Sequence, residues 1–348
     1  MTPQGKNRRG MVNESANPIP GAPKKEGGRH TGFMKTNHTK YDLIGDIHGH
    51  ADTLHALLAK LGYVERDGIH AHPERRVIFL GDFIDRGPKI RETLQTVRAM
   101  TDSGNALAVM GNHEFNAVAY ATPDGRGGWV REHKQRNTEQ HAATLEQFAG
   151  REEEWRGHLE WFRTLPLWME LPGLRVVHAA WDADAIQVLD GKVRLEDALV
   201  RAGGTRGTPE YRAIETLLKG VELQLPDGHF FHDQKNFPRH EIRTKWWKPA
   251  LGGTFRGIAL QPGTDAYEIP ELPADAHAVR LPGYGADERP VFNGHYWLEG
   301  EPELMTHNVA ILDYSVAKDG PLTAYRWDGE QKLDAAKFVQ VRADGVQP

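Results

Sequence analysis

Three short apolar runs in this chain each end at a glycine, and each glycine is followed by side chains that commonly bind metals. The segments are GDIHG at 45–49, GDFIDRG at 81–87 and GNHE at 111–114. A tight turn needs glycine because glycine adopts backbone conformations that other residues avoid. It does not need a carboxylate, an imidazole or a carboxamide as well. The pattern therefore indicates strand ends that meet at one place and bind a ligand there.

The apolar runs and the segments between them predict alternating strands and helices. Buried strands are expected at 41–45, 76–81, 106–111, 174–179, 290–294, 309–314 and 322–327. Amphipathic helices are expected at 52–63, 90–100 and 152–165, the first with Asp52 as its N-cap and Gly62 as its stop. Such alternation is typical of an α/β fold with helices on the faces of buried strands. In these folds ligands bind at the carboxyl ends of strands.

The composition along the chain predicts one folded domain with additions. Residues 1–38 are rich in Gly, Pro, Asn and Lys without apolar periodicity, and are interpreted as a disordered tail rather than a basic arm for acidic partners. The domain is expected to span 39–335, with a C-terminal tail at 336–348. Residues of about 203–289 are rich in Gly, Pro, His and aromatic side chains. They are interpreted as an irregular insertion over the active site.

Composition excludes several classes of function. The formal net charge of −5 provides no global basic field, so neither nucleic acid nor membrane is an expected partner. The chain has no cysteine, which excludes disulfides, thiolate metal sites and a cysteine nucleophile. No apolar run reaches the roughly 20 residues that span a bilayer, and no secretory signal is visible. The expected location is cytoplasmic.

Six residues that follow predicted strands offer oxygen or imidazole ligands. They are Asp46, His48, Asp82, Asn112, His178 and His295. This mixture suits manganese, iron, zinc or nickel better than calcium, which prefers an all-oxygen shell. One ion would not use six such ligands comfortably, whereas two ions sharing one carboxylate would. Two ions about 3.5–4 Å apart are a recurrent device for hydrolysing phosphate esters.

Each of these residues also has an ordinary structural interpretation. Asp46 and Asn112 could serve turns, and a lone histidine such as His178 is more often a hydrogen-bonded core residue than a ligand. All of these interpretations would have to hold together, at strand ends and in one order along the chain. A shared metal site explains the whole set and is therefore favoured.

The ordered set of GDIHG, GDFIDRG and GNHE, followed by VHA at 177–179 and GH at 294–295, resembles the calcineurin-like metallophosphoesterases. Within that family it is similar to the phosphoprotein-phosphatase branch, which includes protein Ser/Thr phosphatases and bacterial symmetric diadenosine tetraphosphatases. The resemblance implies a four-layer αββα sandwich, in which helices cover two mixed β-sheets.

The resemblance also implies roles for the residues that match the family motifs. Asp46, His48 and the shared Asp82 would hold one ion, and Asp82, Asn112, His178 and His295 the other. His113 matches the general acid that protonates the leaving oxygen, and Asp85 matches the carboxylate that orients it. Arg86 matches the guanidinium that grips phosphate, with Asn112 beside it.

Two further expectations concern the predicted insertion. The family has a second phosphate-binding arginine upstream of the last histidine, and Arg243 is the candidate here, although Arg239 and Arg256 are near it in sequence. Trp246 and Trp247 could stack on an adenine ring, or they could form the buried core of the insertion. The sequence slightly favours the core.

The resemblance implies a hydrolase in which a hydroxide bridging two divalent ions attacks phosphorus. Manganese is the expected metal, with iron, nickel or zinc as alternatives. The expected substrate is a phosphorylated small molecule, a dinucleoside polyphosphate or a phosphoprotein. Two alternatives stay open: symmetric cleavage of bis(5'-nucleosyl) tetraphosphates to ADP, and a catalytically inactive metal-binding scaffold. The sequence leaves the oligomeric state open.

Overall fold

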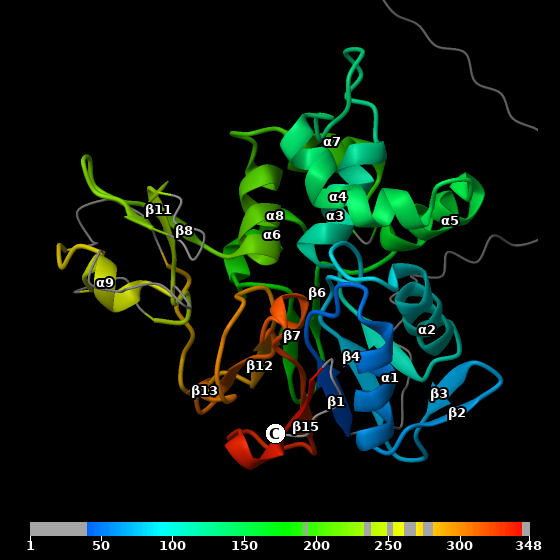
Figure 1. Cartoon of the computed structure of the whole chain (residues 1–348). Coiled ribbons are helices and arrows are strands. Elements are labelled where there is room, and N and C mark those ends of the chain that lie inside the picture. The colour runs from blue at the N-terminus through cyan, green and yellow to red at the C-terminus, as the bar shows by residue number, and fades with distance from the viewer. Residues whose placement is uncertain are drawn as a thin grey trace, which may run out of the picture. The chain divides into compact units, whose positions relative to one another are not determined.

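The computed structural model describes residues 40–190, 192, 194–232, 238–248, 253–260, 269–273 and 281–342. The predicted tail at 1–38 lies outside the described residues, as do parts of the predicted insertion and residues 343–348. Figure 1 shows the described helices and strands arranged around two sheets.

Two five-stranded sheets form the centre of the fold. The first has the order β16-β15-β1-β4-β5 and the second β13-β14-β12-β7-β6. The first sheet has the parallel strands β1, β4 and β5 on one side and the antiparallel strands β15 and β16 on the other. The second sheet has a parallel centre, β14-β12-β7, between the antiparallel edge strands β13 and β6. The first sheet comprises β1 (Tyr41–Ile44), β4 (Arg76–Phe79), β5 (Ala106–Ala108), β15 (Pro321–Trp327) and β16 (Phe338–Arg342). The second comprises β6 (Trp168–Glu170), β7 (Arg175–Val177), β12 (Val291–Asn293), β13 (Leu304–Thr306) and β14 (Val309–Ile311).

The helices and the shorter strands complete the fold. The helices are α1 (Ala51–Lys60), α2 (Ile90–Asp102), α3 (Asn112–Ala121), α4 (Gln135–Gln147), α5 (Glu152–Phe162), α6 (Ala183–Val188), α7 (Asp197–Gly204), α8 (Pro209–Lys219), α9 (Phe255–Ile258), η3 (Val316–Lys318) and η4 (Ala335–Lys337). The minor strands are β2 (Val64–Arg66), β3 (Ile69–Ala71), β8 (Glu222–Gln224), β9 (Phe231–His232), β10 (Pro238–Arg239) and β11 (Glu241–Arg243). None of the described helices is long and apolar enough to cross a membrane.

Alternation along the strands explains why the sheets stack face to face. Successive side chains of a strand point to opposite faces of its sheet. In β1, Leu43 belongs to a buried cluster shared with Val176 and Phe292 of the second sheet, whereas Ile44 belongs to the cluster that contains Leu54 of α1. Both faces of the strand are therefore buried, one against the other sheet and one beneath helices. The predicted four-layer α/β sandwich of two mixed sheets is confirmed.

The predicted strands and the three predicted helices are all present, but two local expectations are wrong. His50, not Asp52, is the N-cap of α1, and the side chain of Asp52 accepts a hydrogen bond from Lys89 instead. Residues 336–348 do not all form a tail. Phe338–Arg342 pair antiparallel with β15 as the edge strand β16.

The segment predicted as an irregular insertion contains more order than expected. Its first part is helical, because α8 has Thr208 as an N-cap and Pro209 in its first turn. The short strands that follow share a small apolar core, which includes Leu223, Phe231 and Ile242. The low apolar periodicity of this segment reflects strands too short to show alternation.

A buried ion-pair network joins the first sheet to its flanking loop. The carboxylate of Asp42 in β1 is fully buried and accepts hydrogen bonds from Tyr63, Arg75 and Arg326. The Arg75 guanidinium, 6% exposed, also donates to the backbone carbonyl of Trp327 in β15. Removing one partner of a buried pair leaves an uncompensated charge.

We therefore expect Asp42→Ala to lower the free energy of unfolding by about 3 kcal/mol or more. Urea unfolding followed by circular dichroism measures this change. The control is Asp52→Ala, which removes an exposed pair with Lys89 and should cost less than about 0.5 kcal/mol. Equal effects of the two variants would show that the Asp42 network does not stabilise the fold.

Candidate active site

The six parallel strands of the two sheets end at one place, and each carboxyl end supplies a polar side chain. The sequence predicted five of these strand ends, and the structure adds a sixth, Asp313 after β14. The residues that follow β1, β4, β5, β7, β12 and β14 are, in order, Asp46, Asp82, Asn112, His178, His295 and Asp313. Five of them are 6% exposed or less, and Asn112 is 8% exposed.

Backbone geometry at these strand ends is unusual. Among the described residues, positive φ angles occur at His48 (46°), Asp82 (53°) and His295 (74°). Such conformations are strained for residues other than glycine and concentrate at functional sites. Close approach also requires glycine, because a Cβ atom on Gly111 would overlap Asp82 Oδ1 and one on Gly294 would overlap Asp46 Oδ1. The glycines in the motifs thus make room for the carboxylates.

The carboxylate of Asp82 is the centre of the site. Its Oδ2 lies 3.6 Å from His48 Nε2, 3.4 Å from His178 Nε2 and 3.9 Å from His113 Nε2. Its Oδ1 accepts a hydrogen bond of 2.9 Å from the backbone N–H of His113. An ion bound about 2.0–2.2 Å from each ligand atom fits between an oxygen and a nitrogen at such separations.

Two groups of potential metal ligands meet at Asp82. One comprises His48, Asp82 and His113, and the other Asp82, His178 and His295. Asn112 belongs to the second group, because its Oδ1 lies 2.8 Å from His295 Nδ1 and 3.0 Å from His178 Nε2. The shared carboxylate predicted from the sequence therefore lies between two clusters of donors.

Asp46 contacts the backbone beside a histidine of the site. The family resemblance assigns Asp46 to the same ion as His48. In the structure both its carboxylate oxygens accept the backbone N–H of His295 at 3.2 Å. Burial and the charge of Asp313 raise the pKa of Asp46 well above its usual value. A cation bound beside Asp46 would offset this repulsion.

Two buried ring nitrogens show that the residues fit a metal. His48 Nε2 and His295 Nε2 are buried and have no hydrogen-bond partner among the residues that the structure describes. A buried polar atom without a partner is costly, and a neutral imidazole nitrogen is a common metal ligand. His48 Nδ1 lies 2.9 Å from the Ile84 carbonyl and His178 Nδ1 lies 2.7 Å from the Leu80 carbonyl. If each Nδ1 donates to its carbonyl, Nε2 is left as the ligand atom.

The electrostatics of the site agree with this geometry. Burial and the nearby His113 lower the pKa of His48 to about 3, so its ring is neutral and able to bind a cation. Burial also lowers the pKa of His295, and Arg243 and His178 lower it further. Burial raises the pKa of Asp82, but the charges of His178 and His113 outweigh it and hold that pKa well below its usual range.

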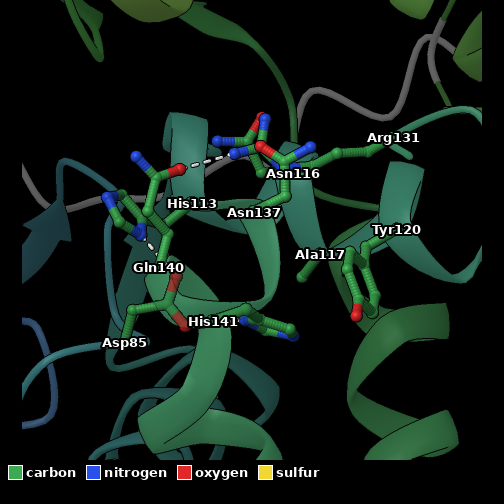
Figure 2. Close-up of a pocket in the computed structure, with 9 residues that line it drawn as sticks. All are labelled: Asp85, His113, Asn116, Ala117, Tyr120, Arg131, Asn137, Gln140 and His141. Carbon is green, nitrogen blue, oxygen red and sulfur yellow. Dashed lines mark hydrogen bonds and ion pairs between the residues drawn. The ribbon is translucent and has the colours of Figure 1, made fainter. Parts of the chain in front are cut away.

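Asp85 joins His113 to a second histidine that the sequence analysis missed. One oxygen of Asp85 pairs with His113 Nδ1, and the other lies 2.7 Å from His141 Nδ1 and 2.6 Å from Thr144 Oγ1. Figure 2 shows Asp85 between the rings of His113 and His141. His141 and Thr144 lie three positions apart on α4, so they share a face of the helix. That spacing was the only sequence signal, and it is common in helices.

Glu114 fixes the backbone around Asp82. Its carboxylate accepts hydrogen bonds from the N–H groups of Asp82, Phe83 and Gly111. Burial, with the charge of Asp82, raises the pKa of Glu114 to about 7. The last acidic residue of the GNHE motif thus holds two motif loops together.

Arg86 lies at the exposed side of the site and packs on an aromatic ring. Its guanidinium carbon is 4.0 Å from the ring centroid of Trp297, and Lys318 Nζ is also 4.0 Å from that centroid. The backbone N–H of Trp297 donates to Asp313 at 2.7 Å. Trp297, Lys318 and Asp313 were missed in the sequence because none of them belongs to a glycine-flanked motif.

The predicted insertion contributes charge to the site, but its two adjacent tryptophans are buried. Arg243 lies 3.9 Å from Glu222 and its charge acts on His295, which places this predicted phosphate ligand in the electrostatic neighbourhood of the centre. Trp246 and Trp247 are 0% and 4% exposed. The core interpretation of the tryptophans therefore holds, and the adenine platform does not.

Comparison with known proteins agrees with the motif reading. Residues 39–258 match the family model of the calcineurin-like phosphoesterases. A bis(5'-nucleosyl)-tetraphosphatase PrpE [asymmetrical] of Bacillus velezensis is 36% identical over 159 residues, 44% of this chain and 61% of the relative. The Bacillus subtilis PrpE is 46% identical over 74 residues, 21% of this chain and 30% of the relative. The chain thus spans less than two thirds of the length of these relatives.

More distant similarities extend over most of the chain. The symmetrical bis(5'-nucleosyl)-tetraphosphatase of Vibrio vulnificus is 25% identical over 316 residues, 83% of this chain and 95% of the relative. Among solved structures, a protein serine/threonine phosphatase from Saccharomyces cerevisiae is 13% identical with a TM-score of 0.46, covering 89% of this chain and 81% of that one. A cold-active protein-tyrosine phosphatase from a Shewanella species is 19% identical with a TM-score of 0.46, covering 89% and 79%.

The shared position of Asp82 generates a metal-binding prediction. We expect Asp82→Asn to reduce bound divalent metal to less than half of the wild-type amount, because Asp82 belongs to both ligand groups. Mass spectrometry of the dialysed, manganese-reconstituted protein measures metal per chain. Asp102→Asn, an exposed carboxylate on α2, is the matched control and should retain wild-type metal content. Full metal loading of Asp82→Asn would exclude a shared ligand at this position.

Proposed function

Because this chain belongs to the calcineurin-like phosphoesterase family, we propose that it hydrolyses phosphoric ester or anhydride bonds at a centre of two divalent ions. The observation that carries the proposal is the pair of ligand groups that share Asp82. The proposed ligands are Asp46, His48, Asp82, Asn112, His178 and His295. When bound, the ions would acidify a water molecule and neutralise charge on the phosphate. Manganese is the metal to test first.

Arg86 is the proposed phosphate ligand of the chain. Arg86 is exposed at the edge of the centre, and the negative charges of Asp82 and Asp85 attract its guanidinium. Packing on Trp297 restricts its position while leaving its N–H groups free to form a fork on phosphate oxygens. Arg243 is proposed as a second, more distant cationic contact.

His113 is the proposed general acid. Burial lowers its pKa, but the charge of Asp82 and the hydrogen bond to Asp85 outweigh that effect, and the pKa of His113 is raised overall. This direction favours the protonated ring that a general acid requires. Its Nε2 faces the centre, 3.9 Å from Asp82 Oδ2. As the oxygen of water bonds to phosphorus, the bond to the leaving oxygen breaks and that oxygen takes the His113 proton.

The substrate class can be narrowed by one reaction. The names of two matched relatives specify bis(5'-nucleosyl) tetraphosphates, with asymmetrical cleavage in one and symmetrical cleavage in the other. We propose these compounds as candidate substrates, with a phosphomonoester as the comparison. The manganese-loaded protein should be incubated with diadenosine tetraphosphate and the products separated by chromatography. ADP alone indicates symmetric cleavage, whereas ATP with AMP indicates asymmetric cleavage.

The same reaction tests the alternative of an inactive scaffold. Every proposed ligand, the acid and Arg86 are present and brought together, which favours an enzyme. Absence of turnover on diadenosine tetraphosphate and on a panel of phosphomonoesters, with metal content confirmed, would contradict the proposed function.

Replacement of the general acid should be most harmful when the leaving group is poor. We expect His113→Asn to lower kcat by about 10²–10⁴-fold for an alkyl phosphate and by less for p-nitrophenyl phosphate, whose leaving oxygen needs no proton. Steady-state kinetics with both substrates at matched metal occupancy give the comparison. The same loss for both substrates would assign His113 to the metal centre instead of to proton transfer.

His141 is expected to act through Asp85 as a positioning residue. His141→Ala removes one of the two side chains that hold Asp85 Oδ1, so we expect a weaker version of the His113→Asn pattern, with a larger loss of kcat for the alkyl phosphate. His141→Asn keeps an N–H donor near the position of Nδ1 and should restore much of the activity. Steady-state kinetics with the two substrates and thermal unfolding distinguish this role from simple destabilisation. Destabilisation would lower kcat for the alkyl phosphate and for p-nitrophenyl phosphate by the same factor.

A further inference from the structure

A pocket opens beside the proposed general acid, and no role has been assigned to it. His113 and Asp85 form part of its wall, and residues of α3, α4 and the loop between them form the rest. Figure 2 shows Arg131 extending from that loop toward Gln140 of α4. The pocket therefore combines the residue that would protonate a leaving group with a guanidinium.

Arg131 carries a charge that its neighbours do not neutralise directly. Its guanidinium donates to Asn116 Oδ1 at 3.1 Å and to Gln140 Oε1 at 2.6 Å, and both acceptors are neutral amides. Within the part of the chain that the structure describes, Arg131 makes no ion pair. It is half-buried, so its charge is only partly solvated. Burial lowers the pKa of Arg131, and the charge of Asp85 raises it.

The hydrogen bonds of Arg131 place it with respect to the reaction centre. Asn116 lies one helical turn after Asn112 on α3, so it projects on the side of the helix that faces the centre. Arg131 is therefore joined to the same helix that carries His113. Arg86, in contrast, packs on Trp297, whose ring lies near His48. The two guanidinium groups thus contact different residues around the centre.

An anion is the ligand that this arrangement would bind. A guanidinium held by two neutral amides has a fixed orientation and retains its charge for a further partner. A bond between it and a phosphate or carboxylate would be charge-assisted on both sides. Because His113 lines the pocket, the leaving oxygen that it would protonate would lie beside the pocket.

We propose that the Arg131 pocket binds an oxyanion carried by the leaving portion of the substrate. The enzyme would then prefer phosphorylated substrates whose leaving group is itself anionic, such as a phosphoanhydride, over esters of neutral alcohols. This inference rests on the proposed function, because it uses His113 to mark the leaving side. Arg131 would determine specificity and would not take part in bond breaking.

Binding of non-hydrolysable ligands tests the inference independently of turnover. The probes are benzylphosphonate, 4-carboxybenzylphosphonate and the corresponding bisphosphonate, titrated calorimetrically into the manganese-loaded protein. We expect the wild type to bind the two ligands that carry a second anionic group at least about tenfold more tightly than benzylphosphonate, the factor typical of one hydrogen bond to a charged group. If only the bisphosphonate gains affinity, the pocket selects phosphate; if both gain, it accepts either oxyanion.

Matched variants identify the residue responsible. Arg131→Met should abolish the preference for the additional anion, and Arg131→Lys should retain part of it because the charge remains. Arg126→Met removes an exposed arginine from the same loop, does not line the pocket and should keep the full preference. Thermal unfolding of each variant checks that the loop between α3 and α4 remains folded.

The outcomes separate this inference from the proposed function. An Arg131→Met variant that binds all three ligands as the wild type does, or that weakens all three equally, would overturn the role of the pocket. Failure to hydrolyse any phosphate ester, with the Arg131-dependent preference intact, would instead overturn the proposed reaction and leave the anion site in place.

Discussion

The buried carboxylate of Asp82 is the interaction on which the rest of this structure depends. Three histidine side chains approach one of its oxygens, and the backbone of His113 donates to the other. His48 and His178 follow strands of different sheets, so the arrangement exists only when the two sheets stack with the ends of their parallel strands together. Stacking in turn requires strands that are buried on both faces, as β1 is. The apolar pattern of the strands and the polar residues at their ends are thus parts of one constraint.

Asp82 lies among the proposed metal ligands, and Asp85, three residues later, pairs with the proposed general acid, His113. Both residues have positive φ angles, which a turn this tight requires. Glu114 holds the backbone of the first, and His141 with Thr144 holds the side chain of the second. The centre is therefore supported from α3 and α4, two helices that lie outside the sheets. Preorganisation of this kind keeps charged groups in place without relying on solvent.

The cations around the centre differ in how they are held. Arg86 packs on the ring of Trp297, which keeps its hydrogen-bonding groups available. Arg131 is held by the oxygens of two amides, which orient its guanidinium without removing its charge. Arg75 belongs to none of the metal-binding motifs, and its charge is instead neutralised by Asp42 of the first sheet. The charge partner of each arginine thus distinguishes a structural role from a ligand-binding one.

Much of the site could be predicted because its ligands follow glycines in short motifs. Such motifs are local: the glycine, the turn and the ligand lie within a few residues, so Asp46, His48, Asp82 and Asn112 could be named before any fold was known. Asp313, Trp297, His141 and Arg131 could not. Each lies in a segment without a glycine-flanked pattern, and each gains its position from a contact with a residue distant in the chain.

The sequence by itself determined the class of fold, the family and the set of proposed ligands, because periodicity and motif spacing are encoded locally. Only the tertiary structure decided which ligands share Asp82, that Asp46 meets the backbone of His295, and that a histidine and an uncompensated arginine adjoin the proposed acid. The physical reason is that these relations depend on how two sheets and two helices pack. Packing is set by the sum of many weak contacts along the whole chain, and no short stretch of residues records it.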